Sequence, residues 1–285
     1  MKRILILQVC ILAALASCTR ESATPAPAGE NGIVPIVFQA EGLDARVDTK
    51  TTPVTALNTF KVLCTKGTSG NETSVWYVDV TKSSNNYLTN QFWPNTDQTY
   101  HFYASNADMG YQQSGGYIKP ANMDTDVVAA YKGSPTYKAT NNLSFEHIFA
   151  RVGTVRINAP TGYQVTNLNV SITPKVADGN VTIYTMATRT WSGGANGSAT
   201  SISNTANMDI SNDLWLLPGT YELTATYTMS RGEWVQSGIT KAANVTLQMG
   251  KINNITATLP AGDASEIVFT VSVTEWAPQS VTATF

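Results

Sequence analysis

The sequence is poor in charge, cysteine and histidine, and each shortage removes a class of protein. Charged residues are 13% of the 285 residues, and the formal net charge is −2. No basic patch is present, so a nucleic-acid partner is not predicted. The two histidines have no metal-ligand spacing around them, and neither a phosphate-binding loop nor a nucleophile elbow occurs. The sequence therefore predicts no enzyme, no metal site and no cofactor.

Long apolar runs are also scarce, and the notable one lies at the N-terminus. Met1-Lys2-Arg3 is followed by the apolar segment 4–16, which only Gln8 interrupts. This segment is too short to span a bilayer but has the length of a signal-peptide core. It ends in Leu15-Ala16-Ser17-Cys18, which resembles a lipobox. We expect cleavage before Cys18 and lipidation of its thiol, which would anchor the chain to a membrane.

The stretch after Cys18 is poor in apolar residues and rich in Pro, Ala and Gly. Such a segment cannot offset the entropy lost on ordering, so 18–32 is predicted to be a flexible tether. Removing 1–17 also removes Lys2 and Arg3, which leaves 16 positive against 20 negative residues, a net charge of −4. The remaining 268 residues suffice for two domains of ordinary size.

Cysteine usage excludes an intrachain disulfide in the mature chain. Of the three cysteines, Cys10 leaves with the signal peptide and Cys18 is expected to be lipidated, so Cys64 remains alone. Cys64 follows Phe60 and Val62 at strand spacing. We interpret it as a buried, unreactive thiol.

Period-two alternation of apolar residues recurs through the chain and predicts an all-β protein. Threonine and serine occupy the intervening positions, as on the exposed faces of extracellular strands. The alternating apolar sets are Tyr221, Leu223, Ala225, Tyr227 and Met229; Leu168, Val170 and Ile172; Val245, Leu247 and Met249; and Ile267, Phe269, Val271 and Val273. Their spacing of roughly 8–14 residues suits antiparallel sandwiches.

One stretch departs from this pattern, and one point divides the chain. Residues 122–132 could form a short helical turn that begins after Asp124 or Thr125 and stops at Gly133. A new sheet is predicted to begin after residue 147, because a polar, turn-rich stretch precedes it and an apolar strand pattern follows. We therefore expect β-domains at 33–147 and 148–285.

Four segments resemble the fimbrillin family of Bacteroidales, the major fimbrial subunit proteins. They are the lipobox with its tether, Gln98-Thr99-Tyr100-His101-Phe102-Tyr103-Ala104, Leu143-Ser144-Phe145-Glu146-His147-Ile148-Phe149-Ala150-Arg151-Val152, and Leu217-Pro218-Gly219-Thr220-Tyr221-Glu222-Leu223. The segments occur in the expected order. The resemblance implies two tandem transthyretin-like β-sandwich domains. It further implies export as a lipoprotein, cleavage by a trypsin-like protease after a basic residue, and assembly into an adhesive fimbria with other subunits and a host or bacterial receptor as partners.

Donor-strand assembly needs a removable strand, a cleavable loop and a donor strand. Val34, Ile36 and Phe38 alternate in a first strand, and Pro35 suggests that this strand lies at a sheet edge. The loop that follows contains two candidate cleavage sites, Arg46 and Lys50. The C-terminal residues Val281, Ala283 and Phe285 alternate as a candidate donor strand. The first strand could equally be permanent, with Arg46 and Lys50 as plain loop charges, and 280–285 could close its own domain.

A second function class is a glycan- or ligand-binding surface lipoprotein that does not polymerise. Six tryptophans are available to stack on sugars, and Trp191 and Trp234 are the better candidates because they lie beside turn signals. The two histidines fit structural positions instead. His101 alternates away from its aromatic neighbours, which predicts a solvent-facing side chain, and His147 at the domain boundary predicts a structural hydrogen bond.

Overall fold

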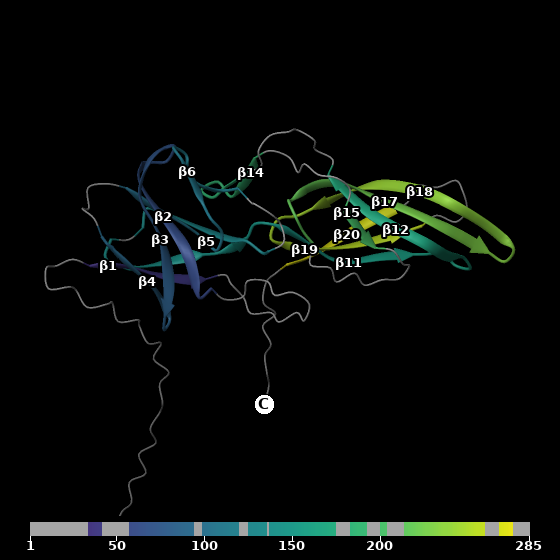
Figure 1. The fold of residues 1–285 in the computed structure, drawn as a ribbon, viewed down its shortest axis with the longest axis horizontal. Helices are drawn as coiled ribbons and strands as arrows, with labels where there is room; N and C mark the ends of the chain where they lie inside the picture. The colour runs from purple at the N-terminus through teal and green to yellow at the C-terminus, as the bar shows by residue number, and fades with distance from the viewer. Residues whose placement is uncertain are drawn as a thin grey trace, which may run out of the picture.

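The computed structural model describes residues 34–41, 57–93, 99–119, 125–135, 137–174, 183–192, 200–203, 214–259 and 268–275. Within these ranges all the regular secondary-structure elements are β-strands, so the predicted all-β class is confirmed. We call the described residues up to His147 the N-terminal half and those from Ala150 the C-terminal half. Figure 1 shows the two halves one after the other along the long axis of the molecule.

The N-terminal half is built on one eight-stranded sheet. Its order is β10 (Glu146–His147), β8 (Val128–Gly133), β5 (Tyr100–Ser105), β2 (Thr59–Thr68), β3 (Asn71–Ser83), β4 (Asn86–Phe92), β1 (Pro35–Glu41) and β9 (Thr140–Ser144). All neighbours are antiparallel except β1 and β9. The sheet folds over on itself, because the rings of Phe38 on β1 and Phe102 on β5 lie 4.9 Å apart.

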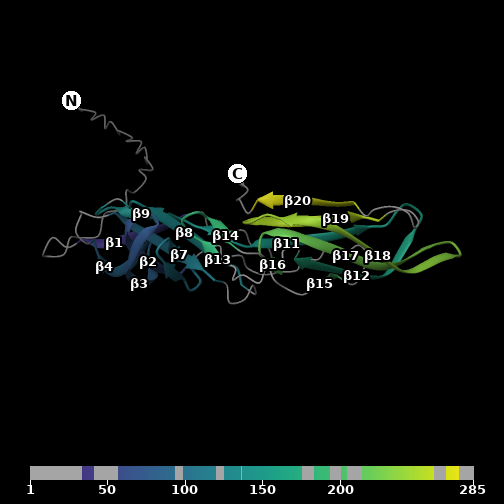
Figure 2. The ribbon, with the colours of Figure 1, turned by 90° about the horizontal axis from the view of Figure 1, so that it is seen from above.

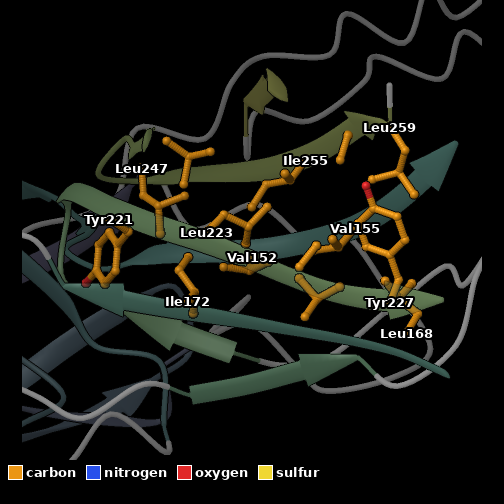
Figure 3. Close-up of a cluster of buried hydrophobic side chains, with 14 of the residues drawn as sticks. Val152, Val155, Leu168, Ile172, Tyr221, Leu223, Tyr227, Leu247, Ile255 and Leu259 are labelled. Carbon is orange, nitrogen blue, oxygen red and sulfur yellow. The ribbon is translucent and has the colours of Figure 1, made fainter. Parts of the chain in front are cut away.

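The core of the C-terminal half lies between two four-stranded sheets that face each other. One has the order β16 (Leu214–Leu216), β11 (Ala150–Asn158), β19 (Lys251–Thr258) and β20 (Val268–Glu275). The other has the order β15 (Thr200–Ser203), β12 (Gln164–Pro174), β17 (Gly219–Arg231) and β18 (Trp234–Leu247). Figure 3 shows side chains from both sheets, among them Val155, Leu223 and Ile255, pointing into the shared core.

The predicted alternation of β17 and β12 is confirmed in this core. The five apolar side chains of β17 and the three of β12 are each at most 2% exposed, while Thr224, Thr226 and Thr228 between those of β17 are half-buried. Burying one such side chain contributes about 1.5–3 kcal/mol. The alternation therefore predicts which side chains of these two strands face the core.

A fourth, small sheet joins the two halves. Its order is β14 (Thr190–Ser192), β13 (Ile183–Thr185), β7 (Gly115–Ile118) and β6 (Gly110–Gln112). We call it the bridging sheet, because β6 and β7 come from the N-terminal half and β13 and β14 from the C-terminal half. Tyr184 pairs with Ile118 across the division. Figures 1 and 2 place these strands in the middle of the molecule.

The predicted helical turn is wrong for its second part, because residues 128–133 form strand β8. Val128 and Ala130 face the core of the N-terminal half, while Val127 and Ala129 face the cluster beneath the bridging sheet. A strand buried on both faces has a continuous apolar sequence, which periodicity does not distinguish from a helix. Residues 122–124 lie outside the described residues.

Candidate functional site

The first strand, β1, is the described part of the proposed assembly machinery. It lies between two strands, antiparallel to β4 and parallel to β9. Its ends are also fixed by main-chain hydrogen bonds: Trp93 N donates to Val34 O at 2.9 Å and Phe145 N to Glu41 O at 2.8 Å. The sequence-based expectation of an edge strand is therefore wrong.

Pro35 fits within the sheet although β1 is not an edge strand. It is the first residue of β1, and pairing with β9 begins only at Val37. The register with β4 shifts between Pro35 and Val37. Because proline is tolerated at the first residue of a strand and at irregularities, its missing N–H does not require an exposed edge.

The side chains of β1 fill the core of the N-terminal half. Ile36 and Phe38 are fully buried, and Val34 packs against the same core from the margin. On the sheet's rim, Gln39 Nε2 donates to Asn86 Oδ1 at 3.0 Å. The three alternating residues of the first strand therefore face the core together, as predicted. Removal of β1 would leave a gap between β4 and β9 that exposes this core.

The other predicted assembly residues lie outside the described residues. They are the lipidation site Cys18, the cleavage candidates Arg46 and Lys50, and the donor residues Val281, Ala283 and Phe285. In the described part of the chain no helix is long and apolar enough to cross a membrane.

Cys64 is 1% exposed, as predicted. Burial raises the pKa of its thiol, which keeps it in the unreactive, protonated form.

The prediction for His101 is wrong, because this side chain is buried beneath the bridging sheet. Its Nε2 lies 3.0 Å from Gly67 O and its Nδ1 lies 2.9 Å from Tyr131 Oη. A carbonyl can only accept, so Nε2 donates to Gly67 O. Both nitrogens are engaged in structural hydrogen bonds.

Glu72 is a buried carboxylate that sequence reasoning missed. Its side chain accepts from Tyr103 Oη, 2.9 Å from both carboxylate oxygens, and from Thr65 Oγ1. Burial and the Glu72 carboxylate raise the pKa of Tyr103. The main chain of Glu72 also bonds to the β6–β7 hairpin, through Gln113 O and the Tyr111 hydroxyl. The cluster therefore fastens the bridging sheet rather than presenting an acid to solvent. Among the described residues, no three His, Cys, Asp or Glu side chains group as metal ligands.

His147 lies where the boundary was predicted, and its Nδ1 is 2.7 Å from Asp126 Oδ2. Trp191, one of the two glycan candidates, is also at this junction. Its Nε1 donates to Ile148 O at 2.8 Å, and its ring stacks on Phe149 at 5.7 Å. Trp191 is therefore a packing residue, whereas Trp234 is 42% exposed.

A profile of fimbrillin-like proteins matches residues 45–276. No curated protein matches the sequence.

Similar solved structures include a Bacteroides ovatus protein named for cell adhesion, which is 11% identical, covers 87% of this chain and 99% of its own, and has a TM-score of 0.49. A Bacteroides uniformis protein named likewise is 14% identical, with coverages of 85% and 99% and a TM-score of 0.49. A fimbrial assembly protein from Parabacteroides distasonis is 12% identical, with coverages of 85% and 99% and a TM-score of 0.41.

Proposed function

The chain belongs to the fimbrillin-like family, and we propose that it is a structural and adhesive subunit of a cell-surface fimbria, exported as a lipoprotein and assembled by donor-strand exchange. The family supports association with other fimbrial subunits at the cell surface. One observation carries the finer mechanism: β1 is a short strand that completes both a sheet and a core. A strand from another subunit with matching alternation would restore both.

In this mechanism a protease cuts after Arg46 or Lys50, and the N-terminal segment with Cys18 and β1 leaves the subunit. The gap between β4 and β9 then exposes the core positions that Ile36 and Phe38 filled. Ten residues, 276–285, follow the last residue of β20, while β1 contains seven. A C-terminal segment of this length is long enough to replace β1, with Val281, Ala283 and Phe285 as its apolar residues.

The lipid on Cys18 is proposed as a tether for transit to the outer membrane. Sequencing the N-terminus of the protein taken from cells tests this directly. A start at lipidated Cys18 alone would mean a permanently anchored protein, whereas a start at Val47 or Thr51 would mean a processed subunit. We also propose that the chain divides into two domains between residues 147 and 148, each with its own core.

Trypsin-like treatment of the purified precursor tests the assembly step. We expect a cut after Arg46 or Lys50, followed by polymers whose length rises with protein concentration. Deleting 280–285 is the matched control, because it should stop growth and leave the monomer folded. Cleaved protein that stays monomeric would contradict the mechanism, and so would a truncated chain that still polymerises.

A further inference from the structure

The core that β1 completes contains a buried hydrogen-bond donor that β1 leaves unused. The side chain of Trp93, the residue after β4, is 9% exposed, and its Nε1 has no acceptor among the described residues. The rings of Phe102 and Tyr137 lie edge-on to the indole, with centroids 5.9 and 5.5 Å away, and a ring face is at most a weak acceptor. Trp191 has the usual arrangement, since its Nε1 donates to a carbonyl. A buried donor without a partner opposes folding.

Trp93 lies directly opposite Val34, at the beginning of β1. Trp93 N donates to Val34 O at 2.9 Å, and Phe92 pairs with Pro35 one position further on. The side chains of Trp93 and Val34 both pack in the core of the N-terminal half. Cβ atoms of directly opposite residues on antiparallel strands are about 4.5–5.5 Å apart, so the side chain at position 34 lies against the indole. Valine has no polar atom, and Nε1 therefore stays unpaired while β1 is in place.

The candidate donor tail repeats the core-facing spacing of β1. The residues that β1 directs at this core are Val34, Ile36, Phe38 and Ala40. The tail has the same spacing at Gln279, Val281, Ala283 and the last residue, Phe285. A tail that runs in the direction of β1 and fills all four positions places Gln279 where Val34 stood, and this direction keeps β4 antiparallel and β9 parallel to the strand between them. The carboxamide oxygen of Gln279 can accept a hydrogen bond.

We propose that Trp93 Nε1 selects the incoming strand by donating to the carboxamide oxygen of Gln279 from another copy. The inference rests on the proposed donor-strand function and adds a register to it. A tail shifted by two residues, or a reversed tail, places an apolar side chain beside Trp93. Because β1 leaves the donor unpaired, replacement of β1 by the tail gains a hydrogen bond that the precursor lacks, and this gain gives the exchange its direction.

The uncleaved full chain tests whether position 34 reaches the indole N–H. Val34→Gln supplies an acceptor on β1 itself, and Val34→Met is the matched control of similar length without one. Each variant is made with Trp93 and with benzothienylalanine at position 93, an isostere in which sulfur replaces the N–H. The unfolding constant of Val34→Gln relative to Val34→Met should be about tenfold smaller with Trp93 than with the isostere. Equal ratios in the two backgrounds overturn the proposal.

A synthetic peptide of residues 276–285 tests the partner. It should bind to protein cleaved after Arg46 or Lys50, and Gln279→Leu in the peptide should weaken binding about tenfold in fluorescence anisotropy. Ser280→Ala is the matched control, because residue 280 faces away from the core in this register and should change the affinity less than about threefold. With the isostere at position 93, the Gln279→Leu peptide should bind as tightly as the original.

The outcomes separate this inference from the function on which it rests. Equal affinities of the original and Gln279→Leu peptides overturn the role of Trp93 and leave donor-strand assembly standing. A Gln279→Leu effect that persists with the isostere also overturns that role, because the glutamine then has another partner. Failure of every peptide to bind overturns donation by this tail, and with it Gln279 as the partner.

Discussion

The two halves of the molecule enclose their cores in different ways. The C-terminal half places two separate sheets face to face, so β12 and β17 each have one buried face and one wetter face. The N-terminal half folds a single sheet over a core, and its outer face is covered in turn by the bridging sheet. Strands β2, β5 and β8 are therefore buried on both faces over part of their length. The two halves therefore differ in how many faces of their central strands are buried, and not in the number of strands.

The largest expected effect concerns the strand that completes the N-terminal core. Phe38→Ala should lower the free energy of unfolding by about 3–5 kcal/mol, because the ring is fully buried and its loss leaves a cavity beside Phe102. Leu223→Ala is the matched change in the C-terminal core, with about 2–5 kcal/mol expected. Guanidinium denaturation measures both, and Val235→Ala serves as the exposed control. A Phe38→Ala loss below about 1 kcal/mol would mean that β1 is only loosely held.

The bridging sheet is expected to make the halves unfold together. Trp191→Ala removes the stack on Phe149 and the hydrogen bond to Ile148, and we expect a loss of about 3 kcal/mol. Two resolved unfolding transitions should replace one in calorimetry. Trp191→Phe keeps most of the stack and should cost about 1 kcal/mol for the missing donor. A single unchanged transition in Trp191→Ala would show that the halves are coupled elsewhere.

The covered outer face of the N-terminal sheet depends on Glu72. Glu72→Gln keeps the size of the side chain but replaces one accepting oxygen with a donating group, so the hydroxyls of Thr65 and Tyr103 compete for the remaining one. We expect a loss of about 1–3 kcal/mol and faster proteolysis within the β6–β7 hairpin. Glu233→Gln in the exposed turn between β17 and β18 should change stability by less than about 0.5 kcal/mol. Equal effects of the two changes would contradict a fastening role for Glu72.

The same difference decides how much of the fold was readable from the sequence. Alternation predicted the in-facing residues of β17 and β12, because only one face of each is buried. It failed for His101, since the strand face opposite Phe102 is not wet but lies under β6 and β7, which come later in the chain. It failed for 128–133 for the same reason. The alternation within one strand does not signal that a separate hairpin covers one of its faces.

The candidate site was readable to a similar extent. The burial of Ile36 and Phe38 and of Cys64 followed from strand spacing and was correctly predicted. The position of β1 between β4 and β9 was not, because strand order depends on pairings between residues far apart in the sequence, such as Phe38 with Asn141, which are 103 positions apart. Glu72 was missed because a buried carboxylate has no sequence signal without its partners. Gly116 marks only the tight packing around its partner Tyr103, since a Cβ at position 116 would lie 2.7 Å from Tyr103 Cγ.

The smallest expected effect is a loss of stability at alkaline pH, and it compares buried tyrosines of the two halves. Burial raises the pKa of Tyr221 in the C-terminal core and that of Tyr103 beneath the bridging sheet. An unfolded tyrosine ionises near pH 10, whereas the folded one stays protonated. The stabilisation from this shift is therefore complete below about pH 10 and is lost as the pH rises. Tyr221→Phe and Tyr103→Phe should each flatten the fall in the guanidinium midpoint between about pH 9.5 and 11, while Val235→Ala should not. Both folded tyrosines stay protonated over this range, whether the hydroxyl donates to the Glu72 carboxylate or to the Leu217 carbonyl, so the flattening should be equal for the two variants. A clearly smaller flattening in one variant would mean that this tyrosine already ionises in the folded chain within this pH range.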